Sequence, residues 1–343
     1  MLPPILDAGS EVDQHRANRN IDALMNILTS GPIMANRIAA AHALGNLKAA
    51  EAVPALMDSL HGQTNRDLRV AVAEALGKIG EPALEPLISG LTSDDLQVRR
   101  ASARALGQLA SPRAIDPLID AMEDYTVRDA VSRALGELGD PRAARTLIDA
   151  LGDDSMFVRA AAAEALGNIG DADAEEALLT TMRDRDSEVR RAAAQALGLM
   201  GSSAAIEALI EALNDLPVRT AAIEALGNIG SEVAIEPLVG MLNNMSAKTR
   251  QYAVEALGKI GSPDTTQDLI GRLTDRSMLV RRAAARSLGA IGDVTAVESL
   301  IESMYQDEEI IVSWSAAYAL ELIGAPDGLD AVAEWRAELE EEE

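Results

Sequence analysis

Arginine and aromatic side chains at two places in the sequence have the chemistry to hold a ligand. A guanidinium pairs bidentately with a carboxylate or a phosphate, and arginine, tryptophan and tyrosine dominate the energetics of protein interfaces. The alternative for each group is that the arginines are solvated or pair with neighbouring carboxylates, and that the aromatics cover the end of a core. The candidate partner-binding residues are Arg100, Arg104 and Arg133 in one group, and Arg282, Arg286, Trp314 and Tyr318 in the other.

Residue types that serve catalysis or metal binding are scarce. The chain has no cysteine, and its three histidines, His15, His42 and His61, share no ligand-like spacing. A lone histidine without a nearby carboxylate or second histidine is usually a packing residue, and we expect this of His42. The sequence therefore indicates no catalytic residue, no metal site and no cofactor.

Composition favours helices and excludes several classes of partner. Of the 343 residues, 48% are hydrophobic but only 2% are aromatic, so alanine and leucine supply the apolar mass. A formal net charge of −25 opposes binding to nucleic acid and to anionic membranes. The start, MLPPILDAGSEVDQ, lacks the pattern of a signal peptide, and no apolar stretch has the length of a membrane span. We expect a soluble, cytoplasmic monomer.

The elements that must position these residues are revealed by an internal repeat. The triplet Ala-Leu-Gly occurs in eight copies, a ninth reads Ser-Leu-Gly and a tenth reads Ala-Leu-Glu, and successive copies are 29 to 32 residues apart. A helical period of this length predicts a solenoid of helix pairs. We expect an N-terminal cap segment at 1–19, ten repeats in one continuous solenoid at 20–324, and a C-terminal capping helix with an acidic tail at 325–343. The marker positions are Gly45, Gly77, Gly107, Gly136, Gly167, Gly198, Gly227, Gly258, Gly289 and Glu321.

The fifth repeat shows the unit most clearly. Asp140 and Pro141 suit the N-cap and the first position of a helix. A second helix is predicted from about Met156 to Ile169, and Gly170 ends it in a left-handed cap. The dipeptides Ser111-Pro112, Glu81-Pro82 and Ser262-Pro263 open their repeats in the same way. Because glycine inside a helix costs about 1 kcal/mol relative to alanine, we expect the marker glycine to let the next repeat approach closely.

A second recurrence lies eight residues before the marker, where nine of the ten repeats have arginine and the tenth has Ser313. A ladder of cations could serve a phosphate-bearing ligand. Uniformity along the array favours a structural ladder instead, in which each arginine ties an inter-helix turn through backbone carbonyls or through carboxylates such as Asp154, Asp186 or Asp215. The ladder comprises Arg37, Arg69, Arg99, Arg128, Arg159, Arg190, Arg219, Arg250 and Arg281.

The pattern V-R-x-A-A-x-E-A-L-G-x-I-G, preceded by D-P-x-A-x-x-x-L-I, resembles the HEAT-like repeats of the bilin-lyase (PBS lyase) type. The resemblance implies an all-α fold, an α-solenoid with a right-handed superhelix. It also implies that the second helices line the concave surface, so that positions seven and three before the marker and one after it face a partner. The candidate partner-binding residues occupy the first two of these rows.

Three functions are compatible with this pattern. The first is a non-enzymatic scaffold or adaptor that binds a protein partner on the concave face. The second, implied by the resemblance, is a bilin-lyase-like protein that binds a tetrapyrrole and its acceptor protein, although seven aromatic residues are few for such a pocket. The third is a DNA-repair solenoid, which the net charge opposes. No His-Glu pair recurs as in the di-iron HEAT-repeat hydroxylases, and we prefer the scaffold.

Overall fold

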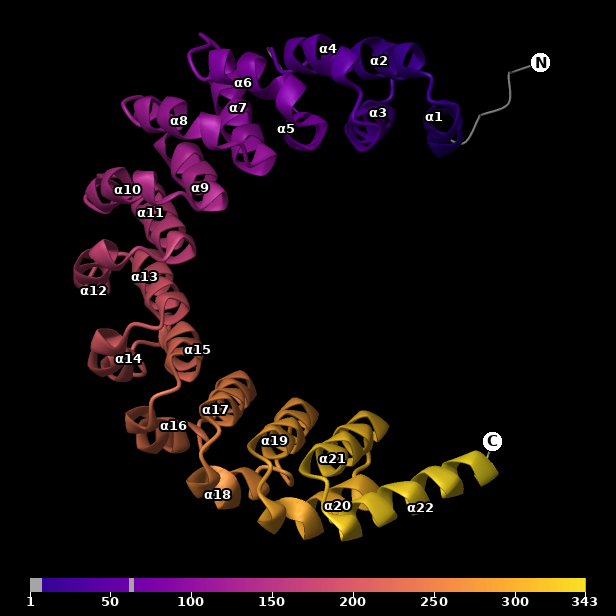
Figure 1. Ribbon diagram of the computed structural model, residues 1–343, viewed down its shortest axis with the longest axis vertical. Helices are drawn as coiled ribbons and strands as arrows, with labels where there is room; N and C mark the ends of the chain where they lie inside the picture. Colours follow the sequence, from indigo (N-terminus) through magenta and orange to yellow (C-terminus); the bar gives the residue numbers. More distant parts are fainter. Residues whose placement is uncertain (1–7, 62–64, 343) are drawn as a thin grey trace. The chain divides into compact units, whose positions relative to one another are not determined.

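Helix pairs follow one another along the chain in the computed structural model, which describes residues 8–61 and 65–342 (Figure 1). Within these residues there are ten pairs, one helix before them and one after them, and no strand. The predicted all-α solenoid of ten repeats is confirmed. The first seven residues of the predicted cap segment and Glu343 of the acidic tail lie outside the described residues; the rest of these segments contain α1 (Ala8–Ala17) and α22 (Pro326–Glu342).

The first helix of each repeat is short, and from the second repeat on a three-residue 3-10 turn precedes it. The first helices are α2 (Ile21–Ser30), α4 (Val53–Asp58), α6 (Leu84–Gly90), α8 (Ile115–Ala121), α10 (Ala144–Ala150), α12 (Glu175–Thr181), α14 (Ile206–Ala212), α16 (Ile235–Met241), α18 (Thr266–Ile270) and α20 (Val297–Gln306). The 3-10 turns are Ala50–Ala52, Glu81–Ala83, Pro112–Ala114, Pro141–Ala143, Ala172–Ala174, Ser203–Ala205, Glu232–Ala234, Pro263–Thr265 and Val294–Ala296.

The second helix of each repeat is longer and carries the marker position. These helices are α3 (Met34–Asn46), α5 (Arg66–Ile79), α7 (Leu96–Leu109), α9 (Arg128–Leu138), α11 (Met156–Ile169), α13 (Ser187–Met200), α15 (Arg219–Ile229), α17 (Ala247–Ile260), α19 (Met278–Ile291) and α21 (Ile310–Ile323).

The chain divides into two compact units, Met1–Ala177 and Leu178–Glu343. In the first unit, each second helix from α3 to α11 packs on the next one, and the first helices form the other layer (Figure 1). The second unit repeats this arrangement from α13 to α21. The continuous superhelix over 20–324 and its right-handed twist stay predictions.

Leucine and alanine fill the space between the two layers of each unit. The first helices contribute a leucine with no exposed surface, such as Leu87 and Leu118, and the second helices contribute the leucine of the Ala-Leu-Gly triplet, such as Leu76 and Leu106. Burial of one such side chain stabilises a fold by about 1.5–3 kcal/mol. The small alanines beside these leucines let the helix backbones approach one another, which explains how a core forms with so few aromatics.

The fifth repeat matches its prediction closely. The Asp140 carboxylate accepts a hydrogen bond from the Arg142 N–H at 2.9 Å, and α11 has the predicted bounds. Gly170 has a φ of 71° and donates to the Leu166 carbonyl. The helix opening differs: Pro141 lies in a 3-10 turn, and the α-helix begins at Ala144. Such turns are frequent at helix N-termini. Ser111 and Ser262 occupy the equivalent cap position with extended backbones but make no side-chain cap bond.

The marker glycines stand where two second helices meet. A Cβ on Gly136 would lie 2.6 Å from the Cα of Ala165, and one on Gly198 would lie 2.5 Å from the Cα of Ala225. No side chain fits at such distances, so the predicted close approach is confirmed at these positions. In the tenth repeat, Glu321 instead forms an ion pair with Arg336 of α22 at 2.8 Å.

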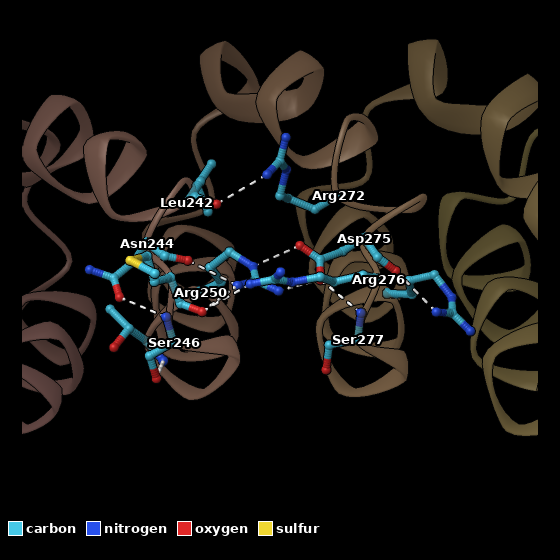
Figure 2. A network of polar contacts seen from close by, with 11 residues as sticks. Leu242, Asn244, Ser246, Arg250, Arg272, Asp275, Arg276 and Ser277 are labelled. Carbon is cyan, nitrogen blue, oxygen red and sulfur yellow. Dashed lines mark hydrogen bonds and ion pairs between the residues drawn. The ribbon is translucent and has the colours of Figure 1, made fainter.

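The arginine ladder is structural, as predicted. In eight repeats the guanidinium donates to a backbone carbonyl that precedes its own helix: seven of these carbonyls lie in the turn between the two helices, and Leu28, the acceptor for Arg37, lies in the last turn of α2. For example, Arg250 Nη1 donates to the Asn244 carbonyl at 2.9 Å (Figure 2). The equivalent bonds are Arg37 to Leu28, Arg99 to Ser93, Arg128 to Met122, Arg159 to Asp153, Arg190 to Asp184, Arg219 to Leu213 and Arg281 to Asp275.

The carboxylate partners of the ladder agree only in part with those expected. They come from the turn of the following repeat, 25 or 26 residues further on, so each pair joins two repeats. Of the three aspartates predicted, Asp215 pairs with Arg190, whereas Asp154 accepts from Arg159 through its backbone carbonyl. The pairs, measured between nitrogen and oxygen, are Arg99–Asp124 at 2.8 Å and Arg128–Asp153, Arg190–Asp215, Arg250–Asp275 and Arg281–Asp307, each at 2.7 Å.

Of the five pairs given above, the one between Arg250 and Asp275 is the most enclosed, since each side chain is 5% exposed (Figure 2). Asp275 accepts from Nε at 2.8 Å and from Nη2 at 2.7 Å, and also from the Ser277 N–H at 2.9 Å. Burial alone would raise the pKa of Asp275, but these hydrogen bonds and the guanidinium charge outweigh it, so this pKa lies below its ordinary value. The same balance lowers the pKa of Asp307 beside Arg281.

Candidate functional site

The three arginines predicted together in the first unit do line one pocket. Its volume is about 300 Å³, and it lies among the exposed faces of α5, α7 and α9. Arg100, Arg104 and Arg133 share this lining with residues that the sequence analysis did not select: Arg66, Arg69, Gln97, Asp129 and Glu137. Arg66 and Gln97 each lie one helical turn before a position that was predicted to face a partner. This helical spacing could have identified both residues from the sequence.

Two of the three predicted arginines are paired within this pocket, hereafter the α5–α9 pocket. Arg100 Nη2 lies 2.8 Å from one carboxylate oxygen of Asp129, and Arg133 Nη1 lies 3.3 Å from the other. Arg100 also donates from Nε to the Thr126 carbonyl at 3.2 Å. Arg104 forms no hydrogen bond or ion pair within the described part of the chain. The alternative interpretation was that these arginines are solvated or pair with neighbouring carboxylates; Arg100 and Arg133 are paired, and Arg104 is exposed to solvent.

Glu137 forms the far edge of the α5–α9 pocket. Its carboxylate occupies the space over Gly107, because a Cβ on that glycine would lie 2.6 Å from Oε2. Burial raises the pKa of Glu137 above its ordinary value, and the charge of Arg104 only partly opposes this shift. The glycine therefore makes room for an acidic side chain next to the unpaired guanidinium.

The second predicted group is divided by the structure. Arg282 and Arg286 line a pocket of about 490 Å³ between α17 and α19, which we call the α17–α19 pocket. Neither arginine has an ion pair within the described residues. The remaining polar wall consists of Gln251, Glu255 and Lys259, and Leu279 closes one side.

Trp314 and Tyr318 do not line the α17–α19 pocket. The ring of Trp314 meets that of Trp335 edge-on, with centroids 4.9 Å apart, and the Arg336 guanidinium lies 5.7 Å from the Trp314 centroid. Trp335 is 6% exposed, whereas Trp314 is 46% and Tyr318 is 56% exposed. Trp314 therefore packs against the terminal helix α22 and stays partly exposed, and the alternative that it covers the end of the core together with Tyr318 stays a prediction.

Exposed apolar side chains extend along the same face of α21. Ile311 and Leu322 are 44% and 51% exposed, and they share the helical spacing of Trp314 and Tyr318. We call these four residues the α21 strip. The α19 and α21 helices pack side by side, so the strip and the two arginines lie on neighbouring helices of one unit (Figure 1).

His42 departs from the expectation that no carboxylate is near it. Its Nδ1 lies 3.7 Å from Oε2 of Glu74, which belongs to the next second helix. Both side chains are more than one-third exposed, and the distance is too long for a hydrogen bond. Across the described residues, no three histidine, cysteine, aspartate or glutamate side chains converge on a possible metal site. No helix among them combines the length and apolar character of a membrane span.

Family models for HEAT repeats match residues 21–95, 84–157, 146–217 and 237–321, which together cover most of the chain. The protein belongs to the HEAT repeat family. In addition, residues 218–244 of this HEAT repeat protein match the PBS lyase HEAT-like repeat, the type that its sequence resembles. None of the curated protein sequences compared with it matches significantly.

Among solved structures similar to this HEAT repeat protein, two with TM-scores above 0.5 support the fold. Importin beta covers 92% of the chain at 16% identity and a TM-score of 0.61, and the chain covers 52% of importin beta. The YibA protein of Escherichia coli covers 77% at 23% identity and a TM-score of 0.54, with 99% of YibA covered. The CpcE–CpcF complex of phycocyanin lyase from Nostoc sp. PCC7120 covers 75% at 24% identity with a TM-score of 0.42, and 94% of that chain is covered.

Proposed function

We propose that this HEAT repeat protein is a non-enzymatic scaffold that binds a protein partner through the exposed face of its second helices. One observation carries the proposal. The chain has 55 acidic residues against 30 basic ones, yet Arg104, Arg282 and Arg286 form no ion pair among the described residues and line pockets on that face. Guanidinium groups that stay unpaired in so acidic a chain are available to an external anionic group.

The two pockets suit different parts of a partner. The α5–α9 pocket is polar and favours an anionic group. The α17–α19 pocket has Leu279 in its wall and the α21 strip on the neighbouring helix, so it favours a segment that combines carboxylates with apolar side chains. Because the guanidinium groups are accessible to solvent, salt screens their attraction, and binding should weaken between low and moderate ionic strength.

The test begins with affinity capture of a partner from the native lysate and continues with purified components. One test variant is the single substitution Arg104→Glu, and the other combines Arg282→Glu with Arg286→Glu. Both reverse charges that form no ion pair in the described structure. Arg145→Glu is the control, since Arg145 lies on a first helix and is 83% exposed beside Asp149. We expect the pocket variants, but not Arg145→Glu, to bind the partner more weakly than the wild-type protein does. Equal affinity of all variants would refute the proposed face and leave the fold unaffected.

The alternative is a bilin-lyase-like protein that binds a tetrapyrrole and its acceptor protein. The match of residues 218–244 to the PBS lyase HEAT-like repeat favours it. Against it, the linings of the α5–α9 and α17–α19 pockets contain no aromatic residue, and tetrapyrrole pockets rely on such side chains. Titration of the purified protein with a linear tetrapyrrole, followed by visible absorption, separates the two functions: a saturable spectral shift would favour the alternative.

The scaffold proposal includes three further expectations. The protein acts as a cytoplasmic monomer, and it binds neither nucleic acid nor membranes because of its net charge of −25. Light scattering coupled to size exclusion measures the mass in solution, and binding assays with duplex DNA and with anionic vesicles at low salt check the other two.

A further inference from the structure

We infer that the α5–α9 pocket binds a phosphoryl group carried by a phosphorylated side chain of the partner protein. This inference rests on the proposed function and specifies the chemistry of one of its two pockets. The starting point is the charge of the lining, which contains five arginines and two carboxylates around about 300 Å³. The local excess of positive charge is opposite in sign to the net charge of the chain, −25.

Several guanidinium N–H groups in this pocket donate no hydrogen bond to another described residue. A guanidinium carries five N–H donors. Neither Arg66 nor Arg104 has a hydrogen bond or ion pair within the described residues. The bonds of Arg133 leave from Nη1 alone, toward Asp129, so its Nε and Nη2 are available. These donors come from α5, α7 and α9, so three helices contribute donors to the lining of one pocket.

Other contacts hold the pocket in place before any ligand arrives. Asp129 is 21% exposed and accepts from both Arg100 and Arg133, and the Thr126 carbonyl accepts from Arg100. Side chains that are already ordered lose less conformational entropy on binding. Asp129 therefore acts as a positioning residue for two of the arginines.

A phosphoryl group can accept hydrogen bonds from more of these arginine donors than a carboxylate can. A carboxylate offers two oxygens, and one arginine fork satisfies it. A phosphorylated side chain presents three oxygens and a charge of about −1.5 to −2 at neutral pH. Donors from three helices match three oxygens, and the excess of arginine over carboxylate in the lining matches the dianion. Arginine clusters are the usual means by which proteins recognise phosphorylated motifs.

Larger anions are disfavoured by the surroundings of the pocket. A nucleic acid would extend its phosphates beyond the lining, where the acidic surface repels them. A nucleotide base would find no ring to stack on, because no aromatic residue lines the pocket. A single phosphoryl group on a peptide places its charge inside the pocket and little charge outside it.

Two labelled peptides test the inference by fluorescence anisotropy at fixed ionic strength. The probe is fluorescein-Gly-Ser-Gly-phosphoserine-Gly-Ser-Gly, and the same peptide with glutamate in place of phosphoserine is the comparison. The test variant is Arg66→Gln with Arg104→Gln, which removes two guanidinium groups without structural partners. Its control, Arg282→Gln with Arg286→Gln, removes the same charge from the α17–α19 pocket.

We expect the phosphopeptide to bind at least about tenfold more tightly than the glutamate peptide, inorganic phosphate to compete, and affinity to fall as the pH drops below about 6, where the phosphate takes up a proton. The test variant should lose at least about tenfold in affinity and the control should not. Equal binding of the two peptides, or equal losses in the two variants, would overturn the inference.

The result is distinguishable from failure of the proposed function. If neither peptide binds while a captured partner still requires Arg104, the phosphoryl assignment is wrong and the scaffold function remains. If the phosphopeptide binds through Arg66 and Arg104 but charge reversal leaves partner capture unchanged, the pocket recognises phosphoryl groups and the proposed partner face is wrong.

Discussion

Asp275→Asn tests whether the ladder between repeats stabilises the fold. The substitution keeps the size of the side chain and removes its charge, so Arg250 is left 5% exposed without a counter-ion. Loss of one member of a buried, bidentate pair costs about 3–5 kcal/mol, because the remaining charge stays desolvated. The matched control is Asp149→Asn, which removes a pair between side chains that are 83% and 65% exposed. Such a pair contributes about 0–1 kcal/mol.

The measurement is urea unfolding followed by far-ultraviolet circular dichroism at pH 7 and at lower pH. The pKa of Asp275 is lowered in the folded protein, so its contribution is complete above the pKa of the unfolded chain, near 4. The contribution disappears as the pH falls through the folded pKa, where the carboxylate takes up a proton. The difference between wild type and Asp275→Asn should therefore shrink below about pH 4. If Asp275→Asn lost no more stability than Asp149→Asn at pH 7, the reasoning would be refuted.

Three other predictions concern packing and pairing, each measured by the same unfolding assay. Gly198→Ala should lower the free energy of unfolding by about 1–3 kcal/mol through overpacking, because its Cβ would lie 2.5 Å from the next second helix. Gly240→Ala is the control: nothing lies within 4 Å of its Cβ, so the free energy of unfolding should rise by up to about 1 kcal/mol. Asn244→Asp supplies the carboxylate that the ladder lacks 25 residues after Arg219, and a gain of about 1 kcal/mol is expected; an unchanged midpoint would contradict the pairing rule. Trp335→Ala should lower the free energy of unfolding by at least about 3 kcal/mol, since this ring is 6% exposed. Unfolding of α22 alone should then be visible as an early transition.

The sequence predicted those parts of the fold that repeat. The bounds of α11, the left-handed cap at Gly170 and the close approach at Gly136 all follow from a pattern that returns every 29 to 32 residues. A recurring feature is predictable because one physical requirement selects the same residue type each time. The 3-10 turns were missed, since apolar spacing does not separate a tight turn from the first turn of an α-helix.

The carboxylate partners of the ladder could have been found from spacing alone. Aspartate stands 25 residues after Arg99, Arg128, Arg190 and Arg250, but turns of different length hide this regularity when repeats are aligned on the marker. The candidate site was predicted in part. Helical spacing brought Arg100, Arg104 and Arg133 together, whereas the position of Trp314 depended on how α22 packs, which no repeat of the pattern specifies.

The ion pairs between neighbouring repeats also make one side of a repeat complementary to the facing side of the next repeat. Five ladder arginines reach forward to an aspartate in the turn of the next repeat, whereas the tenth repeat has Ser313 at the ladder position and offers no such contact. A family built in this way can lengthen by duplication of about 31 residues without inventing an interface. At the end of the chain, α22 packs on α20 and α21 of the last repeat, and without it the surface of these two helices would be open to another molecule. Helix α22 occupies that end, held through Trp335 and through the pair between Arg336 and Glu321. If α22 prevents such contacts, removal of residues 325–343 should convert a discrete particle into one that polymerises with concentration.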